Sequence, residues 1–146
     1  MAETTETTTA TTEAPAAKPT YTWGVGRRKS AVARVRIAPG TGKVEINGRE
    51  LNDYLVNERD RKALFGPLEV TNLGGKVDVH CRCSGGGLTS QSGAIVMGLA
   101  RALRRYDVTL EPALRAQGFM TRDSRMKERK KYGQRGARRK FQFSKR

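Results

Sequence analysis

The densest cluster of chemically useful side chains in the first third of the chain is basic. The ten residues RRKSAVARVR contain five cations and no acid, namely Arg27, Arg28, Lys29, Arg34 and Arg36. A guanidinium without a carboxylate partner suits phosphate, because its planar donors match two oxygens at once. We expect Arg28, Arg34 and Arg36 to share one face of a strand and to contact phosphate. A solvated sheet face is the alternative.

A second basic cluster fills residues 122–146, which hold twelve Lys or Arg against two acids. Aromatic side chains and glycines lie between the charges. Flat rings beside arginines stack on unpaired bases while the guanidinium groups bind phosphate oxygens, so this pattern favours an extended segment threaded through folded RNA. A nonspecific polybasic tail is the alternative. The residues expected to contact RNA are Arg122, Arg125, Lys127, Arg129, Lys130, Lys131, Tyr132, Gly133, Arg135, Gly136, Arg138, Arg139, Lys140, Phe141 and Phe143.

The stretch GGGLTSQSGA is the one place that resembles a nucleotide loop. Glycines at the start of a helix expose backbone N–H groups that can hold phosphate. No Gly-Lys-Ser/Thr follows, so it is not a Walker motif. Thr89, Ser90 and Ser92 serve equally well as helix caps. An RNA phosphate at this helix start and simple capping both stay open.

Metal and carboxylate chemistry are both poorly supported. The sequence HCRC places His80, Cys81 and Cys83 together, but a zinc site needs four ligands and these are the chain's only His and Cys residues. We expect no metal and no cofactor. Asp53, Glu58 and Asp60 lie among arginines and are interpreted as helix surface charges.

The elements that position these groups follow from hydrophobic spacing. Residues 31–37 and 77–83 alternate apolar and polar side chains, as half-buried strands do. Residues 44–46 form a short strand that closes at an Asn-Gly turn. Short helices are expected over residues 49–55 and 58–65, ending before Gly66 and Pro67, and then a strand around 68–70 that pairs antiparallel with 77–83.

The clearest helix is AIVMGLARALRRY, whose apolar residues recur at helical spacing. Arg101, Arg104 and Arg105 fall on its other side and are further candidates for RNA contact. A last short helix is predicted from Pro112 to about Gln117, with Gly118 as its stop. Strands and helices together indicate a two-layer α+β domain, with about four strands in a mixed or antiparallel sheet and the helices on one face.

Composition divides the chain into three parts. Residues 1–20 are rich in Thr and Glu and are expected to be disordered, residues 21–121 form the domain, and residues 122–146 form the tail. The whole chain of 146 residues has a formal net charge of +15, which implies a polyanion as partner. No apolar run is long enough to span a membrane, and we expect a cytoplasmic protein.

Several segments together resemble one known family. TWGVGRRKSAVARVRI, GKVEINGREL, GGGLTSQSGAI, ARALRRY and the block from Pro112 to Arg146 are similar to the ninth protein of the bacterial small ribosomal subunit, the universal S9 family. The resemblance covers roughly residues 20–146. It implies an α+β domain like the second domain of ribosomal protein five, with a long extended C-terminal tail and no catalytic activity.

The resemblance also implies partners. The domain would bind ribosomal RNA in the head of the small subunit, beside neighbouring head proteins, and the tail would reach transfer RNA in the P site during translation. That last role would fall on Ser144, Lys145 and Arg146. Two other classes remain as alternatives, a small nucleotide-using enzyme built around GGGLTSQSG and a general polyanion binder.

Overall fold

A computed structural model describes residues 20–144. Within that range the strands are β1 (Thr22–Arg28), β2 (Ala31–Pro39), β3 (Val44–Ile46), β4 (Arg49–Glu50) and β5 (Val77–Ser84). The helices are α1 (Leu51–Tyr54), α2 (Glu58–Val70), α3 (Leu88–Tyr106) and α4 (Glu111–Ala116), with a short 3₁₀ helix η1 (Val108–Leu110) before α4. The expected disorder of residues 1–20 concerns a segment that, apart from Thr20, lies outside the described residues.

The five strands form one mixed sheet in the order β1-β2-β5-β3-β4. β1 pairs antiparallel with β2, β2 antiparallel with β5, and β5 parallel with β3. The Asn-Gly turn is confirmed, and it forms a hairpin, because Asn47 and Gly48 have φ values of 53° and 76° and join β3 to β4. Positive φ at both central residues is what a tight two-residue hairpin turn requires.

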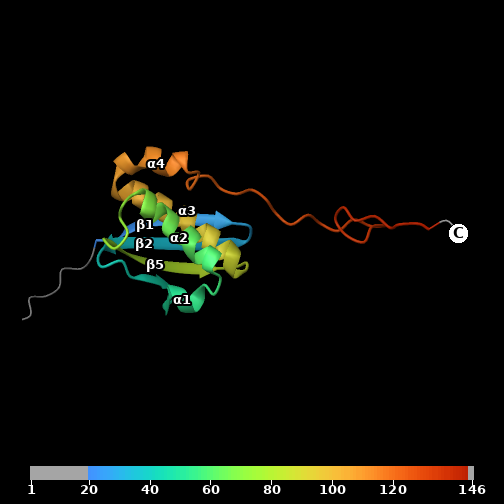
Figure 1. The fold of residues 1–146 in the computed structure, drawn as a ribbon, viewed down its shortest axis with the longest axis horizontal. Helices are drawn as coiled ribbons and strands as arrows, with labels where there is room; N and C mark the ends of the chain where they lie inside the picture. The colour runs from blue at the N-terminus through green and yellow to red at the C-terminus, as the bar shows by residue number, and fades with distance from the viewer. Residues whose placement is uncertain (1–19, 145–146) are drawn as a thin grey trace, which may run out of the picture.

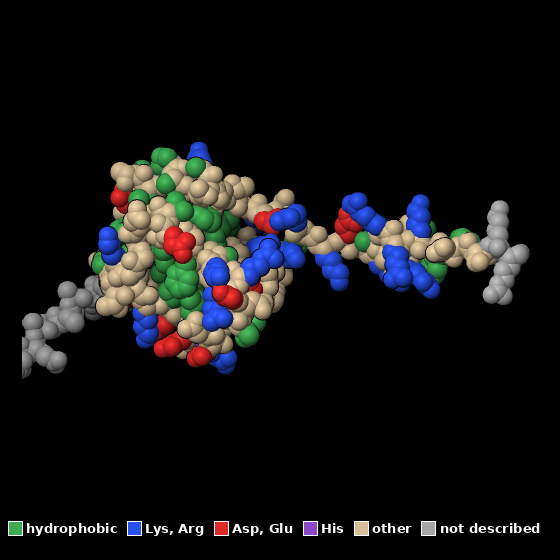
Figure 2. Space-filling model, viewed as in Figure 1, with side chains coloured by type: hydrophobic (Ala, Val, Ile, Leu, Met, Phe, Trp, Pro, Cys, Tyr) green, Lys and Arg blue, Asp and Glu red, His purple; other side chains and the backbone are tan. Residues whose placement is uncertain are grey.

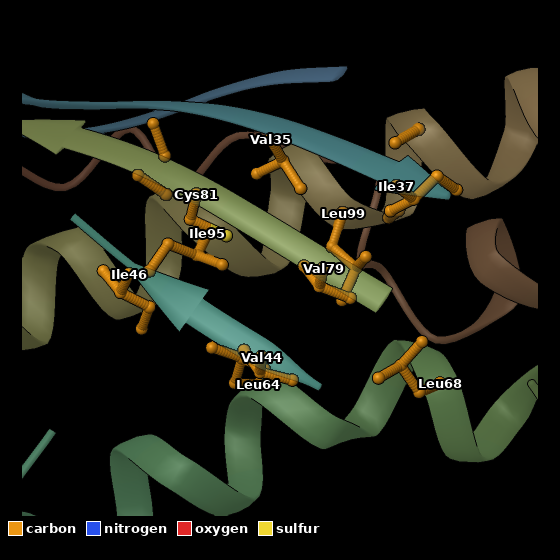
Figure 3. Close-up of a cluster of buried hydrophobic side chains, with 14 of the residues drawn as sticks. Val35, Ile37, Val44, Ile46, Leu64, Leu68, Val79, Cys81, Ile95 and Leu99 are labelled. Carbon is orange, nitrogen blue, oxygen red and sulfur yellow. The ribbon is translucent and has the colours of Figure 1, made fainter. Parts of the chain in front are cut away.

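The core lies between one face of this sheet and the helices, as a two-layer α+β domain predicts. Val35 of β2, Val79 of β5 and Ile46 of β3 are fully buried, and Figure 3 shows their side chains directed toward those of α2 and α3. Leu64 of α2 and Leu99 of α3 are also fully buried. In Figure 1 both helices lie across the same side of β1, β2 and β5. The α+β prediction is confirmed.

Helix α3 packs on β1 with almost no space between the two backbones. A Cβ atom at Gly24 would collide with the carbonyl oxygen of Gly98, and one at Gly26 would collide with the carbonyl oxygen of Ala94. Glycine is therefore required at both strand positions for the helix to approach so closely. This contact fixes which way β1 faces, and so which of its side chains lie on the open side of the sheet.

The predictions for residues 58–70 are wrong in two respects. Helix α2 does not end before Gly66 but continues through Gly66 and Pro67 to Val70. Leu64, Pro67 and Leu68 are buried at helical spacing, so tertiary packing overrides the low helix propensity of Gly and Pro. No strand forms around 68–70 as a result, and β5 pairs with β2 and β3 instead.

The remaining helix predictions hold with shifted bounds. Helix α3 begins six residues earlier than the apolar pattern, at Leu88. Ile95, Leu99 and Leu103 are fully buried as expected. Helix α4 has Pro112 in its first turn and is followed by Gly118 at a φ of 75°, as the short-helix prediction requires.

Beyond α4 the chain leaves the domain as a long extended tail (Figure 1). From Arg122 to Ser144 it contains turns and bends but neither helix nor strand. Across residues 20–144, no helix has both the length and the apolar character needed to cross a membrane.

Candidate nucleic-acid interface

The open face of the sheet, opposite the helices, carries arginines from three strands. The β1–β2 register places Arg27 across from Val32 and Val25 across from Arg34. Arg34 and Arg36 therefore share a face with Arg27, and Arg82 of β5 joins them directly across from Arg34. Lys29 lies at the exposed tip of the β1–β2 hairpin, with a φ of 51°.

Arg28 does not belong to that face, and the prediction that it shares one with Arg34 and Arg36 is wrong. Its partner across the strands is Ala31, which is buried on the helix side of the sheet. The Arg28 side chain lies against Gly93 of α3 and forms an ion pair with Asp123, 3.1 Å between Nη2 and Oδ2. The local sequence contains no acid, so only the tertiary fold could reveal this partner.

The Asp123 carboxylate accepts several hydrogen bonds where the tail leaves the domain. The backbone N–H of Arg125 donates to its Oδ1 at 3.0 Å, and the Arg125 guanidinium donates to both carboxylate oxygens. These hydrogen bonds, with a smaller contribution from Arg28, hold the pKa of Asp123 well below its ordinary range. The carboxylate thus connects the root of the tail to β1.

The helix arginines are exposed as predicted, but each also has a protein partner. Arg101 donates to the carbonyl oxygen of Val25 at 2.7 Å, and Arg105 donates to that of Trp23 at 2.8 Å. β1 is an edge strand, so these guanidinium groups satisfy carbonyls that would otherwise be unpaired. Arg104 pairs with Glu111 at 2.8 Å. A contact with phosphate would use donors that these bonds leave free.

The glycine-rich start of α3 is not capped by hydroxyl groups as one reading proposed. Gly87 is the N-cap residue and no side chain caps the helix. Thr89 donates to the Asp60 carboxylate at 3.1 Å, and Ser92 donates to the Asp60 carbonyl at 3.0 Å. Asp60 is buried, so its interpretation as a surface charge is wrong. These side chains tie α3 to α2.

The strand carrying HCRC shows no metal site. Cys81 is buried and Cys83 half-buried, whereas His80 lies on the open face beside Glu45, 3.0 Å between Nδ1 and Oε2. Hydrogen bonds from Lys43, and then from His80, lower the pKa of Glu45. No group of three metal-ligating side chains occurs among residues 20–144.

The tail displays its cations to solvent along its whole described length, as the blue side chains in Figure 2 show. Tyr132 is 95% exposed and Phe143 is 90% exposed. Such exposure of aromatic rings is costly in water and favours a partner that covers them. Lys145 and Arg146, the expected ends of the interface, lie outside the described residues, and Ser144 is exposed.

Part of the tail closes into a small loop held by charge. Glu128 accepts three hydrogen bonds from the guanidinium of Arg138, the two shortest at 2.9 Å from Nε and 2.6 Å from Nη2. Lys131 donates to the carbonyl of Ala137 at 3.0 Å. Arg135 stacks over the ring of Phe141, with its guanidinium carbon 5.4 Å from the ring centre. The sequence analysis placed Gly133 and Gly136 in the RNA interface but did not identify the role of Glu128.

Sequence reasoning also overlooked Trp23 on the open face, which is 49% exposed. The signal was present, because Trp23, Val25 and Arg27 alternate with Gly24 and Gly26. A strand whose glycines face a helix must present the other residues to the opposite side. The fold and the charge distribution together define a small, strongly basic α+β protein.

Comparison with known proteins narrows this class. The model of the ribosomal protein S9/S16 family matches residues 26–146. The small ribosomal subunit protein uS9 of Rhodopirellula baltica is 57% identical over 123 residues, covering 84% of this chain and 90% of that protein. The uS9 of Thermotoga maritima is 55% identical over 127 residues, covering 85% and 95%. The uS9 of Anaeromyxobacter sp. is 52% identical over 122 residues, covering 84% and 94%. The chain belongs to the ribosomal protein S9/S16 family.

Proposed function

We propose that this chain binds ribosomal RNA in the head of the small ribosomal subunit and that the end of its tail contacts transfer RNA in the P site. Membership of the ribosomal protein S9/S16 family makes it a structural, non-enzymatic component of the small subunit. The RNA contacts follow from its charges, and the transfer RNA contact from the family resemblance.

The observation that carries the RNA proposal is the exposed, cation-rich tail. From Arg122 to Ser144 its acids are Asp123 and Glu128, and both are engaged by arginines of the chain itself. Apart from Lys131, whose Nζ lies 3.8 Å from Glu128 Oε2, the other cations of this segment are left to face a partner. A segment of this kind cannot bury its own rings, so packed RNA supplies both phosphate for the guanidinium groups and bases for the aromatic side chains.

The domain would supply a second, shorter set of contacts. Arg27 and Lys29 lie at one end of the β1–β2 hairpin, and Arg34 and Arg36 lie along the open face. With about eight phosphate contacts in all, affinity would fall roughly 10³- to 10⁵-fold between 50 and 200 mM salt. The domain would thus anchor the protein while the tail enters the RNA.

Removing Lys145 and Arg146 tests the transfer RNA contact. Subunits with the trimmed chain should assemble, and should hold P-site transfer RNA more weakly by on the order of 1 to 3 kcal/mol, since two charge-assisted contacts are lost. The matched control removes two cations from the surface of α2, Arg59→Ala with Lys62→Ala. Unchanged transfer RNA affinity and unchanged reading-frame maintenance in the trimmed subunits would refute the contact.

The general polyanion binder remains a distinct alternative for the isolated protein. It requires equal affinity for duplex DNA, heparin and ribosomal RNA, and release from the subunit in a high-salt wash. Retention in the small subunit through that wash is the result we expect. The nucleotide-using enzyme is not supported, because the Thr89 and Ser92 hydroxyl groups of its loop bind Asp60 and the family is structural.

A further inference from the structure

The open face of the sheet contains a hollow of about 590 Å³ that the functional assignment does not explain. Its walls come from β1, β2, β5 and the β3–β4 hairpin, and include Trp23, Arg34, Arg36, Glu45, His80 and Arg82. Side chains of alternate residues on neighbouring strands line up across the sheet. The strand register therefore determines which side chains line the hollow together.

Two rows of side chains cross the sheet here. One row runs Trp23, Arg36, His80 and Glu45 over β1, β2, β5 and β3. The adjacent row runs Val25, Arg34 and Arg82. The first row contains one carboxylate, that of Glu45, which contacts His80 at 3.0 Å and also Lys43 at 2.8 Å.

The second row contains a like-charge pair. Arg34 and Arg82 are directly opposite each other on antiparallel strands, and both are exposed. Opposed like charges destabilise a sheet, and neither guanidinium has a carboxylate partner among residues 20–144. An anion bound between them would remove the repulsion and accept donors from both forks.

Aromatic rings border the same hollow. Trp23 is 49% exposed next to Arg36, and the Arg36 guanidinium lies 4.7 Å from the centre of the Tyr21 ring. The Tyr21 ring in turn meets the His80 ring edge-on, with 6.1 Å between centroids. Trp23 thus offers a flat apolar surface in the same hollow as the guanidinium groups of Arg34 and Arg82.

We propose that this hollow binds one unpaired nucleotide of an RNA strand, with its phosphate between Arg34 and Arg82 and its base stacked on Trp23. The inference deepens the proposed RNA-binding function and rests on it. An acidic peptide would match the arginines but would offer no ring to cover Trp23. In duplex nucleic acid the base faces are already stacked on their neighbours, so a single strand fits best.

The full-length chain tests this directly because Trp23 is its only tryptophan. Titration with oligouridylate of about eight nucleotides, within the usual single-strand site size, should quench Trp23 emission. RNA bound only on the tail would leave that emission unchanged. Duplex DNA of equal charge and a poly-glutamate peptide should not quench it.

Two double variants distinguish RNA binding in the hollow from a general attraction of RNA to surface cations. Arg34→Ala with Arg82→Ala should raise the RNA concentration at half-quenching roughly ten- to hundredfold, as loss of two charge-assisted contacts implies. Arg59→Ala with Lys62→Ala removes the same charge from α2 and should shift it far less. Absence of quenching, equal shifts in the two double variants, or equal quenching by poly-glutamate would overturn the inference.

Incorporation into the small subunit provides the separate readout. Suppose that the full chain enters subunits and is retained in them through a high-salt wash, but that oligouridylate does not quench Trp23 in the titration. The hollow is then not a nucleotide site, and the proposed function stands. If the chain fails to be retained in subunits at all, the proposed function itself is wrong.

Discussion

Arg28 on β1 and Asp123 at the root of the tail form an ion pair, 3.1 Å between Nη2 and Oδ2, that joins residues 95 positions apart in the sequence. Asp123 also accepts the backbone N–H of Arg125. One carboxylate of the tail root thus binds both a residue of β1 and the next turn of the tail. We therefore predict that this arrangement orients the tail where it leaves the domain.

Asp123→Asn should loosen that junction. The amide keeps the size of the side chain but loses the charge that attracts Arg28 and Arg125. Spin labels at Glu69 and Met126 should show a broader distribution of distances than in the parent chain. Asp107→Asn is the matched control, because Asp107 binds Thr109 away from the tail.

A charge exchange completes this test. Arg28→Asp together with Asp123→Arg should narrow the distance distribution again, whereas Arg28→Asp alone should not. If Asp123→Asn leaves the distribution as narrow as in the parent chain, the ion pair does not orient the tail.

Gly26→Ala should destabilise the domain by about 1–3 kcal/mol or more, because overpacked sites force the backbone apart. The added Cβ would collide with the carbonyl oxygen of Ala94, a backbone atom of α3 that cannot rotate away. Chemical unfolding of the full chain measures the change. Gly74→Ala is the control, since nothing lies within 4 Å of its added Cβ, and equal stability of the two variants would contradict the close packing of α3 on β1.

The sequence predicted the parts of this fold that depend on local patterns. Alternation identified β2, β3 and β5, helical spacing identified α3, and Asn47–Gly48 identified a hairpin. The predicted helix ended too early, before Gly66, because Gly66 and Pro67 are poor helix formers. The helix α2 accommodates both residues because its neighbouring side chains are buried against the core. Local sequence cannot report such packing.

The features of the candidate site also divide into those that local sequence predicts and those that depend on the tertiary fold. The basic character of the tail and of β1–β2 is visible in composition alone. The face occupied by Arg28 is not, because it depends on the glycines of β1 turning toward α3. The ion pairs of Arg28, Arg104 and Arg138 also depend on long-range folding, so charge counts overstated how many donors are free.

Glu128→Gln should open the small loop in the tail. The hydrogen bonds from Arg138, with a further contribution from Lys131, lower the pKa of Glu128. Because the pKa is lowered, the contact between Glu128 and Arg138 is complete above the ordinary glutamate pKa of about 4.3. The contact is lost as the pH falls through the lowered pKa of Glu128. The amide signal of Gly136, which donates to the carbonyl of Arg139, should move with that titration.

In Glu128→Gln the Gly136 signal should stay at its acid position at every pH. Glu58→Gln, which removes an exposed carboxylate paired with Lys62 on α2, is the control and should leave the titration in place. A Gly136 signal that responds to pH equally in both variants would rule out Glu128 as the group that closes the loop.

The two thiols should react slowly while the domain is folded. Burial raises the pKa of the Cys83 thiol to about 11, and raises that of Cys81 further. Only the thiolate reacts with iodoacetamide, so at pH 8 alkylation should be slow for Cys83 and slower still for Cys81. Mass spectrometry before and after unfolding in urea measures both rates. Equal rates in the two states would show that the thiols are not buried.

The most direct test of the central claim is the structure of the small ribosomal subunit containing this chain, determined by electron cryomicroscopy. Residues 122–146 should be ordered, with phosphate oxygens about 2.7–2.9 Å from tail guanidinium nitrogens and bases against Tyr132 and Phe143. A tail without density in the mature subunit, or one folded back on its own domain away from RNA, would contradict the account.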